Sequence, residues 1–226
     1  MPSEAMSVWG MVGQKGGSGK TTIGVQLLTL ALKRGLNATI LDLDRQQSAV
    51  QWYGQRFEKL GDDPLAAASG PPEALSRLLE KAREVDTDLA IVDTSPAIDQ
   101  SMISTARYSD VLIVPTRVDL MDRLSLTQTL EAIDSLNATA KTVVVLNHIS
   151  KDTKAEQSET QKIADEMGIR VLKAKLQSNP DYPASVETGL GAAGYRSNRS
   201  SYRDLVAVYD EIRKFEASLK PRRSRR

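Results

Sequence analysis

Between an apolar run and a helical pattern, the sequence reads Gln14-Lys15-Gly16-Gly17-Ser18-Gly19-Lys20-Thr21-Thr22, which we call the phosphate loop. Glycines in such a loop let backbone N–H groups turn toward phosphate oxygens without a Cβ atom in the way. A helix that begins near Thr21 would add the positive end of its dipole. We expect Lys20 to reach the β- and γ-phosphates and the Thr21 hydroxyl to ligate Mg²⁺. The alternative is an ordinary glycine turn, which would have to match this pattern by chance.

Short apolar runs alternate with helical patterns along the rest of the chain. The runs predict strands at residues 8–12, 38–41, 89–92, 111–114 and 142–146, with a sixth candidate at 171–174. Helical patterns occupy residues 21–34, 47–59, 72–84, 100–108, 123–136, 153–167 and 202–219. This alternation predicts an α/β fold with a doubly wound, mostly parallel sheet, of the P-loop NTPase type. We interpret residues 60–72 as a flexible connector.

Three aspartates follow the predicted strands at the edge where such sheets bind ligands. Asp42 and Asp44 end the second strand, where one could hold Mg²⁺ through water and the other could orient an attacking water. Asp93 ends the third strand and is expected to hold Mg²⁺ through water. For all three, the alternative is a carboxylate that only caps the following helix.

The phosphate loop departs from the ordinary G-x-x-x-x-G-K-[ST] pattern, because Gln14 occupies the first glycine position and a second lysine, Lys15, comes early. In this it resembles the deviant Walker A motif, K-G-G-x-G-K-T, of the ParA/MinD family. The resemblance implies that Lys15 crosses a dimer interface and contacts phosphates of the other subunit, as an arginine finger does. The alternative is a solvated loop lysine. The resemblance also implies that ATP is bound by Lys15, Gly16, Gly17, Ser18, Gly19, Lys20, Thr21 and Thr22.

The resemblance extends to the residues after the strands. Asp44 matches the switch I aspartate that positions the hydrolytic water, and Gln46 matches the glutamine of the same motif, while Arg45 replaces a proline. Adenine is expected to contact Asn147 and the stretch 176–183. Pro115 and Asp119 are expected near the dimer partner. The family assignment thus makes Lys15, Lys20 and Asp44 the catalytic candidates, and Thr21, Asp42 and Asp93 the metal candidates.

Composition narrows the possible classes of protein. The chain has no cysteine, which excludes disulfide scaffolds, thiolate zinc sites and cysteine-held iron–sulfur clusters. It shows no secretory signal pattern and no apolar run long enough to span a bilayer, so we expect a cytoplasmic protein.

Charge is unevenly distributed, because residues 196–226 hold ten basic and four acidic residues, a net +6 that leaves −5 for the rest of a chain of net charge +1. Such a basic end suggests a polyanionic partner. We expect non-specific DNA binding through phosphate contacts. The candidate residues are Arg203 and Lys214 on the last helix and Lys220, Arg222 and Arg223 in the tail. The alternative is a solvated face with a solubilising tail.

The combined expectation is a single ATPase domain, residues 1–219, followed by a basic disordered tail, residues 220–226. The phosphate-loop strand begins by residue 8, so we expect no N-terminal helix-turn-helix domain. The resemblance implies an ATP sandwich homodimer that associates with the nucleoid, and that a ParB-like partner on the cargo stimulates hydrolysis. One alternative is a MinD-like positioning ATPase at a membrane, which needs an amphipathic anchor. Another is an ATP-dependent metabolic synthetase on the same loop.

Overall fold

The computed structural model describes residues 6–61, 66–150, 152–196 and 199–219. Its described strands form one seven-stranded sheet in the order β3-β2-β4-β1-β5-β6-β7, and every pair of neighbours is parallel. The strands are β1 (Ser7–Met11), β2 (Ala38–Asp42), β3 (Ala66–Ser69), β4 (Leu89–Asp93), β5 (Val111–Thr116), β6 (Thr142–Leu146) and β7 (Arg170–Val171). This arrangement confirms the predicted fold class.

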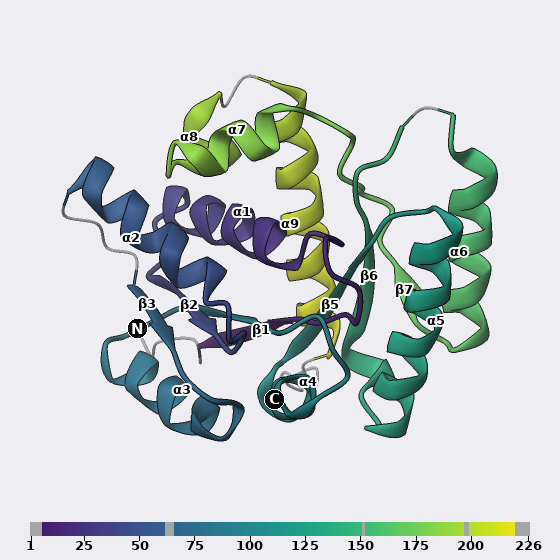
Figure 1. Ribbon diagram of the computed structural model, residues 1–226, viewed down its shortest axis with the longest axis horizontal. Coiled ribbons are helices and arrows are strands. Elements are labelled where there is room, and N and C mark those ends of the chain that lie inside the picture. The colour runs from purple at the N-terminus through teal and green to yellow at the C-terminus, as the bar shows by residue number, and fades with distance from the viewer. Residues whose placement is uncertain (1–5, 62–65, 151, 197–198, 220–226) are drawn as a thin grey trace, which may run out of the picture.

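Helices cover both faces of the sheet (Figure 1). One face carries α1 (Lys20–Lys33), α7 (Asp181–Glu187), α8 (Gly191–Tyr195) and α9 (Ser200–Leu219), with α2 (Ser48–Leu60) beside them. The other face carries α3 (Leu75–Glu84), α4 (Gln100–Tyr108), α5 (Leu120–Ser135) and α6 (Lys154–Glu166). Among the described residues, no helix is both long and apolar enough to cross a membrane.

Alternation along each strand divides the core between the two faces. On β5, Ile113 packs into the cluster that contains α1 and α9, whereas Leu112 and Val114 pack into the cluster that contains α5. Burial on both faces explains why these strands are continuously apolar. The register then places Asp42 opposite Asp93 on neighbouring strands, at the carboxyl edge of the sheet.

The structure differs from the sequence expectation in three places. Residues 66–69 form the edge strand β3, so the prediction of a flexible connector at 60–72 is wrong for these four residues. Strand β3 consists mostly of alanine, which has a low strand propensity, so the sequence did not indicate a strand there. The strand expected at residues 171–174 is the short strand β7, which ends at Val171. Glu211 accepts hydrogen bonds from the backbone N–H groups of Lys173 and Ala174, so these two residues do not continue the strand. Helices α7 and α8 were not predicted.

Candidate nucleotide-binding site

The phosphate loop joins the end of β1 to the start of α1. Gly17 and Gly19 have φ angles of 77° and 103°, in the left-handed region that favours glycine. A Cβ atom on Gly19 would lie 2.4 Å from Asn147 Nδ2. That same nitrogen donates a hydrogen bond of 2.9 Å to the Ser18 carbonyl oxygen. Glycine at position 19 therefore lets the loop close against the end of β6.

Lys20 lies inside the loop and its side chain is buried. The ammonium nitrogen donates to the carbonyl oxygen of Lys15 at 3.3 Å. Burial lowers the pKa of Lys20, and the negative charges of Asp93 and Asp44 oppose this shift. An ammonium held against a neutral carbonyl would gain a stronger, charge-assisted contact from a phosphate oxygen. Its position fits the predicted phosphate contact.

Thr21 and Asp93 meet beside Lys20. The Thr21 hydroxyl donates to Asp93 Oδ2 at 2.6 Å, and the Asp93 side chain is 1% exposed. The second oxygen, Oδ1, is buried and has no hydrogen-bond partner among the described residues. Burial raises the pKa of Asp93 to about 7, although the Thr21 hydrogen bond acts in the opposite direction. A buried carboxylate oxygen without a partner is costly unless it gains a ligand.

This pair fits the predicted magnesium site. Mg²⁺ prefers oxygen ligands and is usually held by one or two protein groups together with water and phosphate oxygens. Thr21 and Asp93 provide such groups next to the phosphate loop. In the part of the chain that the structure describes, no group of three or more His, Cys, Asp or Glu side chains could hold a metal, so water and phosphate would have to supply further ligands.

Asp42 and Asp44 have different surroundings, although they are only two residues apart at the end of β2. Asp42 is buried, and its two oxygens accept hydrogen bonds from the backbone N–H groups of Asp44, Ala49 and Val50. Burial raises the pKa of Asp42, and these hydrogen bonds act against the shift. Asp42 thus anchors the start of α2, as the capping alternative anticipated. Its role as a metal residue stays a prediction.

Asp44 lines a cavity of about 260 Å³ over the phosphate loop, as the water-positioning prediction requires. One oxygen of Asp44 accepts the backbone N–H of Gln46 at 3.0 Å, which shapes the turn before α2. Thr94 also lines this cavity, and its hydroxyl donates to the Met11 carbonyl oxygen at 2.8 Å. The cavity is lined by Gly16, Gly17, Gly19, Lys20, Thr21, Thr22, Asp44, Gln46, Ser48, Thr94 and Pro96.

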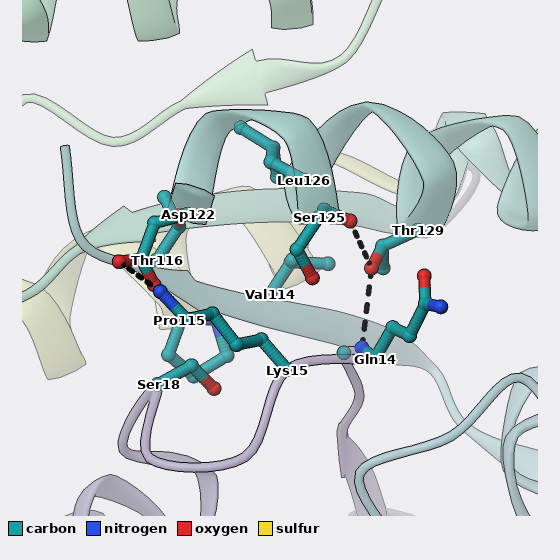
Figure 2. A pocket seen from close by; sticks show the side chains of 11 residues that line it. Gln14, Lys15, Ser18, Val114, Pro115, Thr116, Asp122, Ser125, Leu126 and Thr129 are labelled. Atoms are coloured by element: carbon teal, nitrogen blue, oxygen red, sulfur yellow. Dashed lines mark hydrogen bonds and ion pairs between the residues drawn. The ribbon is translucent and has the colours of Figure 1, made fainter. Parts of the chain in front are cut away.

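The Lys15 side chain extends toward the start of α5. Its ammonium lies 2.6 Å from Asp122 Oδ2 and 3.8 Å from Asp119 Oδ1. Figure 2 shows this side chain reaching from the phosphate loop to Asp122, and the N–H of Gln14 donating to the Thr129 hydroxyl at 3.2 Å. Burial raises the pKa of Asp122, while Lys15 stabilises its charged form. Sequence reasoning did not identify these α5 partners of Lys15, because the contact spans 107 residues.

A larger cavity of about 730 Å³ lies on the other side of the loop, a size typical of small-molecule sites. Asn147 and the exposed His148 line it, together with the predicted stretch from Leu176 to Pro183. The structure adds lining residues that carry no motif, among them Gln26, Arg117, Val186 and Glu187. This cavity is the candidate base end of the site.

The predicted DNA-binding residues Arg203 and Lys214 are exposed on α9. Three acidic side chains of this helix have nearby partners, whereas Asp204 keeps a buried oxygen, Oδ2, without a hydrogen-bond partner among the described residues. Asp210 pairs with Arg34 at 2.5 Å, Glu211 binds two backbone N–H groups, and the buried Glu216 accepts from Arg213 and Trp9. Local contacts thus offset part of the acidic charge near the two basic residues. The other candidates, Lys220, Arg222 and Arg223, lie outside the described residues.

Comparisons with known proteins agree with this geometry. The chain is 23% identical over 221 residues to protein ParA of Rhizobium radiobacter, which covers 95% of this chain and 96% of the relative. A putative plasmid partition protein of Borrelia burgdorferi, solved with AMPPNP bound, has a TM-score of 0.70 at 17% identity, over 95% of this chain and 99% of that one. A chain of the MinC:MinD cell division protein complex of Aquifex aeolicus has a TM-score of 0.72 at 14% identity, over 97% of this chain and 99% of that one.

The family description "CobQ/CobB/MinD/ParA nucleotide binding domain" matches residues 9–192. This span begins within β1 and ends in α8, so it contains the phosphate loop, the strand-end aspartates and both cavities. The loop sequence, the fold and the matched span all agree, and the chain belongs to the CobQ/CobB/MinD/ParA family of nucleotide-binding domains.

Proposed function

We propose that this chain binds ATP together with Mg²⁺ and hydrolyses it slowly. Lys20 would hold the β- and γ-phosphates, Thr21 and Asp93 would hold the metal ion, and Asp44 would orient the attacking water. Bound Mg²⁺ would neutralise charge that develops on the phosphate oxygens. The observation that carries the proposal is the Thr21–Asp93 pair beside Lys20, because it leaves a buried carboxylate oxygen unpartnered where a metal ion would bind.

We further propose that ATP closes a sandwich homodimer through the face that carries Lys15. Three large apolar side chains are exposed at the start of α5, with exposed fractions of 60% for Leu120, 64% for Met121 and 53% for Leu124. They lie next to Asp119 and Asp122, the partners of Lys15. An exposed apolar cluster of this kind favours a protein contact. In the dimer, Lys15 would leave Asp122 and contact phosphates bound by the other subunit.

DNA is the proposed partner of the ATP-bound dimer, with Arg203, Lys214 and the basic tail as its contacts. A monomer offers one such surface and a dimer offers two, so dimerisation would increase the number of phosphates that are neutralised. A ParB-like adaptor on the cargo would then stimulate hydrolysis and release the dimer. The protein would be cytoplasmic and would lie on the nucleoid when ATP is bound, where it would position a plasmid, a chromosome or a protein assembly.

A MinD-like membrane role would need an apolar helix face free for lipid. The apolar stripe of α9 is instead used in the core, where Leu205, Val208, Tyr209, Ile212 and Phe215 are buried. The exposed side of α9 carries the basic residues Arg203 and Lys214, which can contact DNA phosphates but cannot be buried among lipid tails. This observation favours DNA over a membrane as the proposed partner.

The test compares the binding of this protein to DNA with its binding to membranes. Fluorescence anisotropy would measure binding to two duplexes of unrelated sequence, and sedimentation would measure binding to anionic liposomes, each with ATP and with ADP. We expect DNA binding with ATP alone, equal for both duplexes, with a slope of log affinity against log salt of about −0.9 for each phosphate contacted. Arg203→Glu with Lys214→Glu should abolish it, whereas Lys81→Glu with Arg77→Glu, on the exposed side of α3, should not. Liposome binding without DNA binding would contradict the proposal.

A further inference from the structure

Helix α7 forms one wall of the 730 Å³ cavity through Tyr182, Pro183, Val186 and Glu187. It has seven residues, too few to be a stable helix without support from its surroundings. The position of this wall must therefore come from the contacts that hold α7 in place.

Helix α1 provides the first of these contacts through Gln26, which is fully buried. Its amide nitrogen donates to the Tyr182 carbonyl oxygen at 3.2 Å and to the Ser185 hydroxyl at 2.8 Å. Its amide oxygen accepts the backbone N–H of Ala192 at 2.6 Å. A single side chain of α1 thus binds α7 and α8 together.

Helix α2 provides the second set, and it lies outside the cavity lining. Trp52 Nε1 donates to the Val186 carbonyl oxygen at 3.0 Å, Lys59 donates to the carbonyl oxygen of Glu187, and Arg56 donates to that of Gly189. All three acceptors lie in or just after the last turn of α7, where helix carbonyl groups lack intrahelical donors. Cationic donors are favoured at such a C-terminus.

The turn between α7 and α8 is also packed tightly against both supporting helices. Gly189 has a φ angle of 78°, and a Cβ atom there would lie 3.1 Å from the Arg56 Cα atom. Gly191 has a φ angle of 63°, and a Cβ atom there would lie 2.2 Å from the Thr29 hydroxyl oxygen. The turn therefore fits between α1 and α2 without space for a side chain at either glycine.

We propose that Trp52, Arg56 and Lys59 are positioning residues that hold α7 as the wall of the base end, and so determine how strongly the nucleoside part of a nucleotide binds. The inference rests on the proposed function, because it takes the cavity to receive a nucleoside. Helix α2, which carries these three residues, begins at Ser48, a residue that lines the 260 Å³ cavity over the phosphate loop. We call that cavity the phosphate end of the site. The backbone at the start of α2 is anchored by Asp42. Helix α2 thus spans from the phosphate end to the base end without lining the base cavity.

The test uses inorganic tripolyphosphate as a probe that lacks the nucleoside. Calorimetry would give the affinities of ATP and of tripolyphosphate, each with Mg²⁺, for the full chain. We expect Arg56→Ala to weaken ATP binding about tenfold, as loss of a charged hydrogen bond would, and to leave tripolyphosphate binding unchanged. Trp52→Phe keeps an aromatic side chain, although a smaller one, and removes the N–H donor, so it should weaken ATP in the same selective way. Arg56→Lys should restore part of the affinity, and Glu58→Ala, exposed on the same helix, should change neither ligand.

The outcomes separate the inference from the proposed function. If the wild-type protein bound neither ATP nor tripolyphosphate, the positioning role of α2 and the proposed function would both be contradicted. If it bound both ligands equally, or if the variants weakened both equally, the positioning role of α2 would be contradicted while nucleotide binding stood. Normal ATP affinity in both Arg56→Ala and Trp52→Phe would also overturn it. Melting temperatures of all variants would be recorded, and Trp52→Phe decides the question if Arg56→Ala does not fold.

Discussion

The phosphate end and the base end of the site lie at the same edge of the sheet but are built differently. The phosphate end is a run of consecutive residues in which Gly17 and Gly19 adopt left-handed backbone conformations, with Asp93 from the neighbouring strand β4. The base end is lined by α1, α7 and the segments that follow β5, β6 and β7. Helices α2 and α8 lie outside this lining and are joined to it by long-range contacts such as the one between Gln26 and Ala192, 166 residues apart. Local backbone geometry sets the first end, and long-range packing sets the second.

This difference predicts how each end responds to substitution. A change at the phosphate end should affect every polyphosphate ligand, whether or not it carries a nucleoside. A change in the supports of α7 should affect nucleosides only.

The largest effect is expected at Asp44, which lines the phosphate-end cavity. Asp44→Ala should lower the hydrolysis rate by a factor on the order of 10²–10⁴, the usual contribution of a positioned acid–base or water-orienting group. ATP affinity should stay within a few-fold of the wild-type value, because the proposed role of the carboxylate is to hold water and not phosphate. Phosphate-release kinetics and calorimetry would check this, with Asp134→Ala on the exposed side of α5 as the control. Hydrolysis by Asp44→Ala at the wild-type rate would remove the assignment.

A somewhat smaller effect is expected at Lys20, where binding itself should be lost. Lys20→Ala should weaken ATP and tripolyphosphate alike, by about 100-fold, because a charge-assisted contact to phosphate disappears. Calorimetry with both ligands would measure it, and the exposed Lys81→Ala would serve as the matched lysine control. Loss of ATP binding with unchanged tripolyphosphate binding would break the division between the two ends.

The last of these effects concerns the pH dependence of stability and arises from Asp93 in the ligand-free protein. Its pKa is raised to about 7 by burial, so the folded protein keeps a proton that the unfolded chain releases near pH 4. The folded state therefore binds more protons between these values, and stability falls as pH rises from about 4 to 7, by up to about 1.4 kcal/mol per pH unit.

The asparagine variant isolates this contribution. Asp93→Asn does not titrate, so the difference in unfolding free energy between wild type and variant should shrink or reverse across this window and level off above it. Urea denaturation at a series of pH values, without nucleotide or metal, would give the difference. A difference independent of pH would mean that Asp93 has the same pKa in the folded and unfolded states, which would contradict this prediction.

The same division between local and long-range structure explains what could be predicted from the sequence. Gly17, Gly19 and Lys20 are recognisable because a phosphate loop requires those residue types at fixed spacing. The parallel sheet is recognisable because strands buried on both faces are continuously apolar, whereas the alanine-rich edge strand β3 gives no such signal. The spacing of Asp42 and Asp44 does not reveal that Asp42 binds the backbone of α2.

At the base end, the sequence indicated the stretch 176–183 only through the family resemblance. Gln26 lies on α1 among apolar residues that are buried in the core. Nothing in the sequence around it indicates a hydrogen-bond partner 166 residues away. Trp52 and Arg56 likewise read as part of an ordinary amphipathic helix. Tertiary packing decides these contacts, and that information is not present in any short segment.

The central claim, an ATP-driven dimer that uses Lys15 in trans, is tested most directly by measuring mass in solution. Light scattering would compare Asp44→Ala, which should bind ATP without hydrolysing it, with the double variant Lys15→Gln, Asp44→Ala. With Mg²⁺ and ATP, the first should have twice the 24.7 kDa of one chain, and with ADP it should be a monomer. The double variant should remain monomeric with ATP while binding ADP as tightly as Asp44→Ala does. An ATP-bound dimer of the double variant, or a monomer in every state, would contradict the account.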